Sequence, residues 1–405
     1  MKIKYSLPVL VLLLILAGCG STQPKAGDDP VAASDLADEI LILDTHMDSP
    51  LVIRDSEGGM TLADADGHFN YEKAKKGGLN AAFMAVYISP SLQETGGGFD
   101  LANELIDLVE ESINRNPEKF AGALNPEDIE ANYRKGLLSL PMGIENGAAL
   151  EKKLENIEYF YNRGIRYMTL THSRVNSICD SSFDEEKSWK GLSPFGREVV
   201  AEMNRTGMIV DVSHVSDDAF FQVLEVSKAP VLATHSCCRH FVPGLERNMS
   251  DEMIRKLAEK GGIIQINFCA SFLDKDYADA SRAVSGKFRE FLKKEDLNWR
   301  DSRAMEYRDQ LLADNPLPEV PLSRVVDHIE HVIGLVGVDH VGLGSDFDGI
   351  GDAVPTGLED VSKYRDLVAE MADRGFSRED IEKICGRNFL RLWREVNEVS
   401  SSWKS

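Results

Sequence analysis

Eight short apolar runs, separated by longer amphipathic stretches, restrict the fold of this chain more than any other feature of its sequence. Stretches between the runs, such as 101–113 and 323–336, carry apolar residues at helical spacing. Strands that alternate with helices predict a parallel sheet. Eight such units with right-handed crossovers predict an α/β fold, a closed (β/α)8 TIM-like barrel. The eight predicted strands are 40–46, 79–88, 139–145, 166–172, 207–214, 230–235, 262–268 and 340–346.

The chain is long for one domain, with 405 residues. Length alone suggests two or three domains, but barrels with insertions can occupy this much chain as one unit. Residues 270–320 read as a polar, helical insertion between the seventh and eighth strands. We expect one barrel domain over residues 38–400, with the insertion above the site or in a contact between subunits.

The first residues predict export and a lipid anchor. Residues 1–18 hold two lysines and then an apolar run, which predicts a secretory signal peptide too short to span a membrane convincingly. The ending LAGC resembles the bacterial lipobox, in which the signal is cut before Cys19 and this cysteine is lipidated; the alternative is an ordinary cleaved signal. Residues 19–37 then form the lipidated cysteine and a flexible tether. Gly20 stands where an aspartate would retain the protein at the inner membrane, which favours the outer membrane of a bacterial envelope.

Charge argues against some partners. The formal net charge is −22, and removing Lys2 and Lys4 with the signal changes it to −24. Such an acidic chain is a poor candidate for binding nucleic acid or an anionic lipid surface. The cysteines that follow Cys19 form no C-x-x-C pair and are odd in number, so we expect at least one to be unpaired and most to be buried small residues.

Metal-binding and proton-transferring side chains stand at the ends of six of the eight predicted strands. His46 and Asp48 come first, and residues i and i+2 of a strand point to one side. The carboxyl ends of barrel strands form one rim, where active sites lie, so we expect all of these residues to converge. The set is His46, Asp48, Glu145, His172, His214, His235 and Asp346.

These residue types point to zinc chemistry. Imidazole and carboxylate without thiolate suit zinc or a similar divalent ion in a catalytic site. The set exceeds one tetrahedral shell, so two ions that share a bridging carboxylate are plausible, with a hydroxide between them that attacks an amide or ester. The remaining histidines we expect to be structural. They are His68, His240, His328, His331 and His340.

At these residues the chain resembles the membrane (renal) dipeptidase family of zinc metallopeptidases. The matching motifs occur in family order from about residue 38 to 395. They are DTHMDSP at 44–50, GIENG at 143–147, YMTLTHS at 167–173, VDVSHVS at 210–216, THS at 234–236, RNMSD at 247–251 and GVDHVGLGSDFDG at 337–349.

The resemblance implies two zinc ions per chain. His46, Asp48 and Glu145 would bind one ion, and Glu145 would bridge to a second ion. His214 and His235 would hold that second ion. Asp44 and Asp348 lie in the same motifs and would either orient the ligands or cap strand ends.

The resemblance also implies roles toward a dipeptide substrate. His172 would stabilise negative charge on the carbonyl oxygen of the peptide bond. Arg247 would bind the free carboxylate of the substrate, with the neighbouring Arg239 as a rival for this role. Asp346 would take a proton from the bridging water and pass it to the leaving amine.

The residues leave two alternative hypotheses for the function open. The protein could be another barrel amidohydrolase, acting on acylated amino acids, lactam or lactone rings, or phosphotriesters. It could also be a non-catalytic surface lipoprotein on the same scaffold. If the protein is a dipeptidase, its residues leave further points undecided. These are acceptance of a D-residue at the second position, opening of β-lactam rings, the metal used in the cell, and formation of a homodimer, which is common in the family.

Overall fold

The computed structural model describes residues 35–56 and 58–403. The predicted signal peptide, Cys19 and nearly all of the predicted tether lie outside the described residues. No helix within the described ranges is long and apolar enough to span a membrane.

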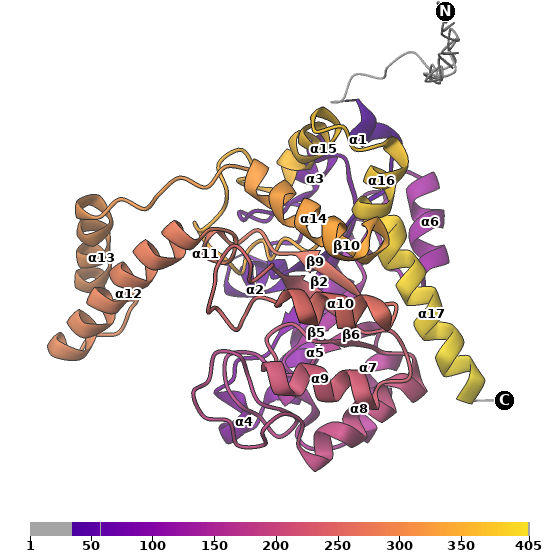
Figure 1. Cartoon of the computed structure of the whole chain (residues 1–405), viewed down its shortest axis with the longest axis horizontal. Coiled ribbons are helices and arrows are strands. Elements are labelled where there is room, and N and C mark those ends of the chain that lie inside the picture. Colours follow the sequence, from indigo (N-terminus) through magenta and orange to yellow (C-terminus); the bar gives the residue numbers. More distant parts are fainter. Residues whose placement is uncertain (1–34, 57, 404–405) are drawn as a thin grey trace, which may run out of the picture. The chain divides into compact units, whose positions relative to one another are not determined.

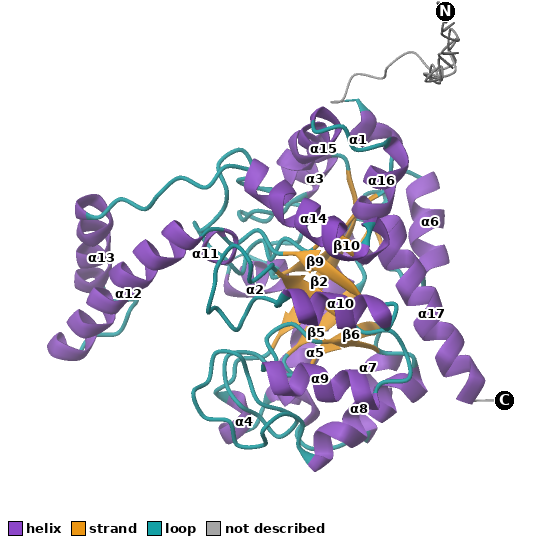
Figure 2. Ribbon diagram, viewed as in Figure 1, coloured by secondary structure: helices purple, strands orange, loops and turns teal. Residues whose placement is uncertain are grey.

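Eight parallel strands form the centre of the fold, and each lies within or overlaps one of the eight predicted runs (Figures 1 and 2). Two very short strands, β3 and β4, extend the sheet beside β2. The eight main strands are β1 (Ile42–Met47), β2 (Leu79–Tyr87), β5 (Met142–Glu145), β6 (Ile165–Thr169), β7 (Ile209–Asp211), β8 (Leu232–Ser236), β9 (Ile263–Ile266) and β10 (Val341–Leu343); β3 is Phe120–Ala121 and β4 is Leu138–Ser139.

The first strand and the segment after the last strand close this sheet. β1 pairs with β2 on one side, and on its other side Met47 forms a parallel bridge with Phe347. The Asp346 N–H donates to the His46 carbonyl at 3.0 Å, and the Asp48 N–H donates to the Phe347 carbonyl at 2.9 Å. These contacts join the two ends of the strand order, so the predicted (β/α)8 barrel is confirmed.

Helices surround the strands, as Figure 2 shows. Several begin at a serine whose hydroxyl accepts a backbone N–H of the first turn, as Ser216 does for α9 and Ser250 for α10. The helices before the insertion are α1 (Leu36–Glu39), α2 (Ser49–Asp55), α3 (Tyr71–Gly77), α4 (Leu92–Thr95), α5 (Gly98–Arg115), α6 (Pro126–Arg134), η1 (Gly147–Leu150), α7 (Glu155–Asn162), α8 (Pro194–Thr206), α9 (Asp217–Val226) and α10 (Asp251–Glu259). Those that follow β9 are α11 (Ala270–Leu273), α12 (Lys275–Glu295), α13 (Ser302–Asp314), α14 (Ser323–Val336), η2 (Val338–His340), η3 (Val361–Lys363), α15 (Tyr364–Asp373), α16 (Arg378–Glu382), η4 (Lys383–Arg387) and α17 (Asn388–Trp403).

The interior of the barrel is filled by side chains and supported by the last helix. Residues of six strands form one buried cluster with α17. The ring of Phe83 on β2 lies 5.1 Å from that of Phe389 and 5.6 Å from that of Trp393, both on α17. Aromatic packing of this kind stabilises the barrel. This packed interior leaves the carboxyl ends of the strands available for a site.

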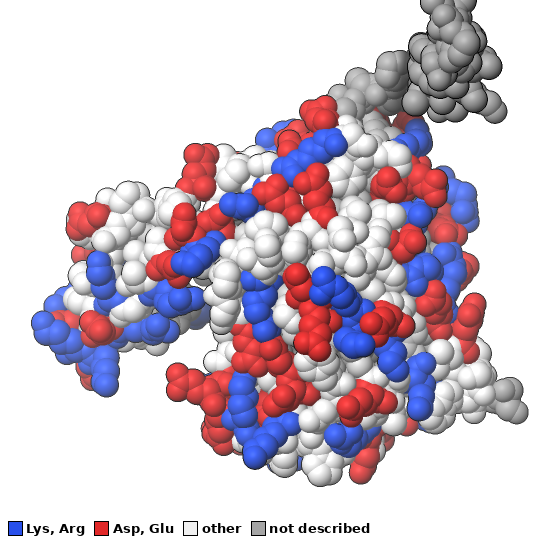
Figure 3. Space-filling view, viewed as in Figure 1, with Lys and Arg blue, Asp and Glu red and all other residues white. Residues whose placement is uncertain are grey.

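The predicted insertion is helical, as expected. It comprises α11, α12 and α13, and Figure 1 shows α12 and α13 standing away from the strands. The rings of Phe291 on α12 and Tyr307 on α13 stack with their centroids 3.8 Å apart and hold the two helices together. Acidic and basic side chains are interspersed over the face of the molecule in Figure 3.

Candidate metal centre

The predicted site residues converge at the carboxyl ends of the strands, although Asp48, His172, His214 and Asp346 lie beyond the strands themselves. β6 ends at Thr169, β7 at Asp211 and β10 at Leu343, so His172, His214 and Asp346 each stand three residues further along, in the following loops. The predicted strand ends at these positions were therefore too long.

The expectation that His46 and Asp48 share one face of a strand was also wrong in one detail. β1 ends at Met47, and Asp48 is not part of the strand but precedes the first turn of α2, with φ −85° and ψ 17°. Pro50 at the start of α2 fits this early helix because its missing N–H needs no partner there. The turn still keeps Asp48 beside its neighbour, with Oδ2 3.7 Å from His46 Nε2.

Glu145, the last residue of β5, lies at the centre of the cluster. Its Oε2 is 3.7 Å from His46 Nε2. Its Oε1 faces other histidines, at 3.1 Å from His214 Nε2 and 3.4 Å from His235 Nε2. The two oxygens of one carboxylate thus face two different groups of imidazole nitrogens.

Three overlapping sets of side chains have ligand atoms within 4.8 Å of one another. They are His46, Glu145 and His235; Glu145, His172 and His214; and His46, Asp48 and Asp346. Among the described residues, His46 Nε2 and Asp48 Oδ1 are buried without a hydrogen-bond partner. A buried polar atom without a partner costs free energy, so these two atoms fit a bound divalent ion.

The charge states suit metal binding. Burial lowers the pKa of both His214 and His235 well below the usual value, with nearby cationic groups adding to the effect, so their imidazoles are neutral and free to bind a metal. Burial alone would raise the pKa of Glu145. The surrounding histidines, His172 and His46 first among them, hold it well below its usual range, so it is an anion at the centre of the cluster.

Further groups orient these ligands. The Tyr167 hydroxyl lies 2.8 Å from Nδ1 of His46, and the Thr234 hydroxyl lies 2.7 Å from Nδ1 of His235. In each case this contact turns the other ring nitrogen, Nε2, toward the cluster. Tyr167 and Thr234 were missed in the sequence analysis. Both stand inside predicted motifs, but nothing in the sequence shows that their hydroxyls reach a histidine.

Asp44 orients the backbone on both sides of the barrel closure. It accepts the N–H of His46 at 2.8 Å and the N–H of Ser345 at 3.1 Å, and it also accepts the Tyr364 hydroxyl. Burial raises the pKa of Asp44 to about 6. Asp348 accepts the Ser49 hydroxyl and the His68 N–H, each at 2.5 Å. Both aspartates therefore fix the loops that carry the site.

Asp346 is held by a residue that the sequence analysis missed. The side-chain amide of Asn267, which follows β9, donates to Asp346 Oδ2 at 2.8 Å. Asn267 is itself buried, and its Oδ1 accepts the N–H of Cys269 at 2.6 Å. Both ends of its amide are thus engaged, which fixes the direction of the Asp346 carboxylate. The two residues are separated by 79 positions, so the sequence gives no sign of this contact.

His172 and Arg247 flank the cluster. His172 Nε2 is 3.6 Å from Glu145 Oε1. Arg247 is 3% exposed, donates to the His235 carbonyl at 2.7 Å, and lies 3.2 Å from His214 Nε2; its Nε has no partner among the described residues. Its rival Arg239 forms two hydrogen bonds to the carboxylate of Asp217, at 2.6 and 2.7 Å, and so belongs to a surface ion pair.

A cavity of about 520 Å³ opens onto the cluster. Glu145, His172, His214, Asp48 and Asp346 form its polar wall. The rest of the lining is largely apolar, and its larger side chains are Leu51, Tyr87, Phe183, Phe272 and Ile350. Tyr87 contacts His172 edge to face at 4.9 Å. A small molecule with an apolar side chain and a polar bond at its centre would fit such a cavity.

The other histidines and cysteines serve the structure. His328 is buried, with Nδ1 accepting the Cys238 N–H at 3.0 Å and Nε2 3.0 Å from the Leu273 carbonyl. His331 pairs with Asp251 at 2.8 Å. The five cysteines in the described part of the chain are free and buried, as predicted.

A cluster of imidazoles and carboxylates that could hold metal, at the carboxyl ends of a (β/α)8 barrel, defines this protein as a metal-dependent hydrolase. A sequence profile described as "Membrane dipeptidase (Peptidase family M19)" matches residues 31–405. The chain belongs to this family, the membrane dipeptidases.

Individual relatives agree with the family assignment. The chain is 34% identical to dipeptidase tcpJ of Claviceps purpurea (strain 20.1) over 355 residues, which cover 84% of this chain and 72% of that protein. It is 34% identical to dipeptidase aclJ of Aspergillus oryzae over 343 residues, which cover 83% of this chain and 72% of that protein.

Two solved structures share the fold. The probable dipeptidase PvdM of Pseudomonas aeruginosa has a TM-score of 0.77 at 27% identity, over 91% of this chain and 98% of that chain. A metallopeptidase of Rhodobacter sphaeroides, solved with a phosphinate mimic of the dipeptide L-Ala-D-Ala, has a TM-score of 0.71 at 23% identity, over 88% and 99%.

Proposed function

We propose that this protein cleaves the peptide bond of dipeptides at a centre of two zinc ions bridged by Glu145. The observation that carries the proposal is the position of the Glu145 carboxylate, whose Oε2 faces His46 while its Oε1 faces His214 and His235. Zinc bound there would supply a hydroxide that is nucleophilic at neutral pH. His46 and Asp48 would hold one ion, and His214 and His235 the other.

The chain's own residues account for the remaining steps. His172 stands at the edge of the cavity and would donate to the carbonyl oxygen as negative charge develops on it. Asp346, held by Asn267, would carry a proton from the attacking water to the leaving amine. Arg247 is the cation beside the second zinc position and would attract the carboxylate of the substrate, whose planar shape its guanidinium matches.

We expect hydrolysis of dipeptides that depends on metal. The soluble chain from residue 20 is assayed with matched L–L and L–D dipeptides, before and after chelation, and its zinc is quantified. The L–D members are included because the resemblance leaves the second position open. We expect about two zinc ions per chain and turnover that is lost on chelation and restored by added zinc, since the nucleophile depends on the ions.

The same assay separates the alternatives. Two zinc ions without turnover of any dipeptide would contradict the proposed substrate and favour another amide or lactone. A chain that binds no zinc and turns over no dipeptide would contradict the enzymatic proposal altogether. Turnover that survives complete removal of metal would contradict the role of the cluster.

We further propose that the mature protein is anchored by lipid on Cys19 at the bacterial cell envelope, in the outer membrane. The support is the LAGC motif and the following Gly20. Expressed with its own signal in a Gram-negative host, the chain should take up a labelled fatty acid and sediment with outer membranes. The C19S variant should lose the label; retention of the label would contradict the proposal. Light scattering of the soluble chain would test for the homodimer that the resemblance implies.

A further inference from the structure

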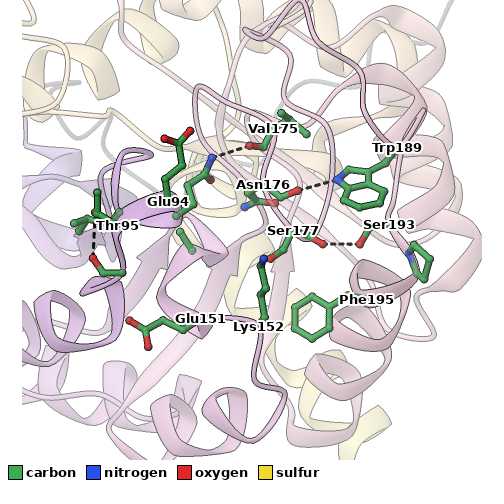
Figure 4. A pocket seen from close by; sticks show the side chains of 15 residues that line it. Glu94, Thr95, Glu151, Lys152, Val175, Asn176, Ser177, Trp189, Ser193 and Phe195 are labelled. Carbon is green, nitrogen blue, oxygen red and sulfur yellow. Dashed lines mark hydrogen bonds between the residues drawn. The ribbon is translucent and has the colours of Figure 1, made fainter.

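A second and larger cavity, of about 920 Å³, lies apart from the metal centre (Figure 4). None of the proposed metal ligands lines it. Its walls come from three places in the chain: α4 with the following glycine, the end of η1 with the two residues after it, and the loop between β6 and the start of α8. The mechanism proposed above makes no use of this cavity.

Part of the cavity lining is apolar. The side chains that form it are Leu92, Val175, Trp189, Pro194 and Phe195. The indole N–H of Trp189 donates to the Asn176 carbonyl at 2.8 Å, which fixes the ring at the edge of the cavity although 42% of this residue is exposed. Exposed aromatic and aliphatic side chains around a concave surface are typical of a ligand site.

Helix α4 presents unused hydrogen-bond acceptors. The side-chain amide of Gln93 donates to the Val175 carbonyl at 2.7 Å, and this bond leaves its Oε1 buried without a partner among the described residues. The adjacent Glu94 forms no ion pair within the described part of the chain. Both residues line the cavity, so α4 offers acceptors to an amine on a ligand.

The side chain that could bind an anionic group, Lys152, lies on a different side of the cavity. Figure 4 shows Lys152 well apart from Glu94. Within the described residues, the Lys152 ammonium has no ion-pair or hydrogen-bond partner. The preceding Glu151 does not compete for it, because its Oε1 accepts the N–H groups of Gly97 and Phe99 at 3.1 and 3.4 Å. Lys152 also has a φ of 62°, an uncommon backbone conformation for a residue other than glycine.

We propose that this cavity is a second binding site that takes a short apolar peptide with a free amine and a free carboxylate. The amine would lie against Gln93 and Glu94, the carboxylate against Lys152, and the apolar side chains against Val175, Trp189 and Phe195. The volume lies within the range of ligand sites and exceeds that of the cavity at the metal centre. The inference does not depend on the proposed dipeptidase activity.

Two asparagines connect the second site to the residue that follows Glu145. The amide of Asn176, whose carbonyl holds Trp189, donates to Asn146 Oδ1 at 3.1 Å and to the Leu170 carbonyl at 2.8 Å. Asn146 is the residue next to Glu145 and has a φ of 87°. A peptide bound on the 175–177 segment would therefore lie one hydrogen bond away from the residue that follows Glu145.

Calorimetric titration of the zinc-loaded chain tests the proposal. The probe is L-leucyl-N-methyl-L-phenylalanine, a zwitterionic apolar dipeptide whose N-methylated bond resists cleavage. We expect a binding event that weakens at least about tenfold in K152E, because a charged hydrogen bond is lost and replaced by repulsion. K153E is the matched control, since Lys153 is the exposed neighbour that does not line the cavity. Its affinity should equal that of the wild type.

Two modified probes sharpen the result. The N-acetylated and the C-terminally amidated forms of the same dipeptide should each bind the second site at least about tenfold more weakly. Equal affinity of K152E and K153E for the zwitterion, or unchanged affinity for both modified probes, would overturn the proposal. A separate event that survives in K152E belongs to the metal centre. If the dipeptidase proposal is wrong and this one is right, only the Lys152-dependent event remains.

Discussion

The E145Q variant should lose bound zinc and nearly all turnover. Glutamine keeps the size of the side chain but removes the anion that lies 3.1–3.7 Å from His46, His214 and His235. One amide oxygen cannot replace two carboxylate oxygens that face different ligand groups. Enzymes commonly accelerate reactions at least a million-fold, and with the centre disrupted we expect dipeptide turnover to fall by at least about 10³-fold, with less than one zinc ion per chain.

The measurement combines zinc quantification with dipeptide hydrolysis on the same preparation. E155Q is the control, because it makes the same substitution at an exposed position at the start of α7. It should retain the zinc and turnover of the wild type. If E145Q kept two zinc ions per chain and full turnover, the bridging role of Glu145 would be refuted.

The G143A variant should be strongly destabilised. Gly143 lies in β5 directly beneath the ring of Tyr167 on β6, and a Cβ atom there would lie 2.1 Å from the ring. The ring has no room to move, because Tyr167 is fully buried, packs 5.4 Å from the ring of Phe83 and contacts His46 through its hydroxyl. Overpacking of this kind costs about 1–3 kcal/mol or more.

Chemical denaturation measures this loss as a fall in the free energy of unfolding. Because Tyr167 orients His46, zinc content should fall as well. G122A is the control: a Cβ at Gly122, just after β3, would meet no atom within 4 Å, and its unfolding free energy should change by less than about 0.5 kcal/mol. A G143A protein as stable as the wild type would show that the barrel interior can adjust where we expect it to be rigid.

The barrel and the proposed metal ligands were predictable because they depend on local patterns. Apolar runs of strand length identify the eight strands, and the ends of parallel strands lie together in any such barrel. Glu145 ends its strand as predicted, and His235 lies within one residue of the end of β8. Nothing more than alternation and position along the chain was needed for these residues.

The loops after the strands could not be predicted in the same way. His214 and Asp346 adopt φ values of 68° and 64°, a left-handed conformation that is uncommon for residues other than glycine and has no pattern in the sequence. It occurs where surrounding contacts impose it, frequently at functional sites. Tyr167 contacts His46, 121 positions away in the chain, and Asn267 contacts Asp346, 79 positions away. Such contacts form only when the strands come together in the barrel.

The contact between Met47 and Phe347, which closes the barrel, also determines when during folding the candidate metal centre can form. His46 and Asp48 leave the ribosome first, yet their loop is fixed by Asp44, which accepts the N–H of Ser345, 301 residues later in the chain. Contacts this distant form late, because a long loop must close before they stabilise anything. A chain still in synthesis therefore lacks the contact between Asp44 and Ser345, so the residues of the candidate metal centre are held together only after the segment that follows β10 has folded against β1.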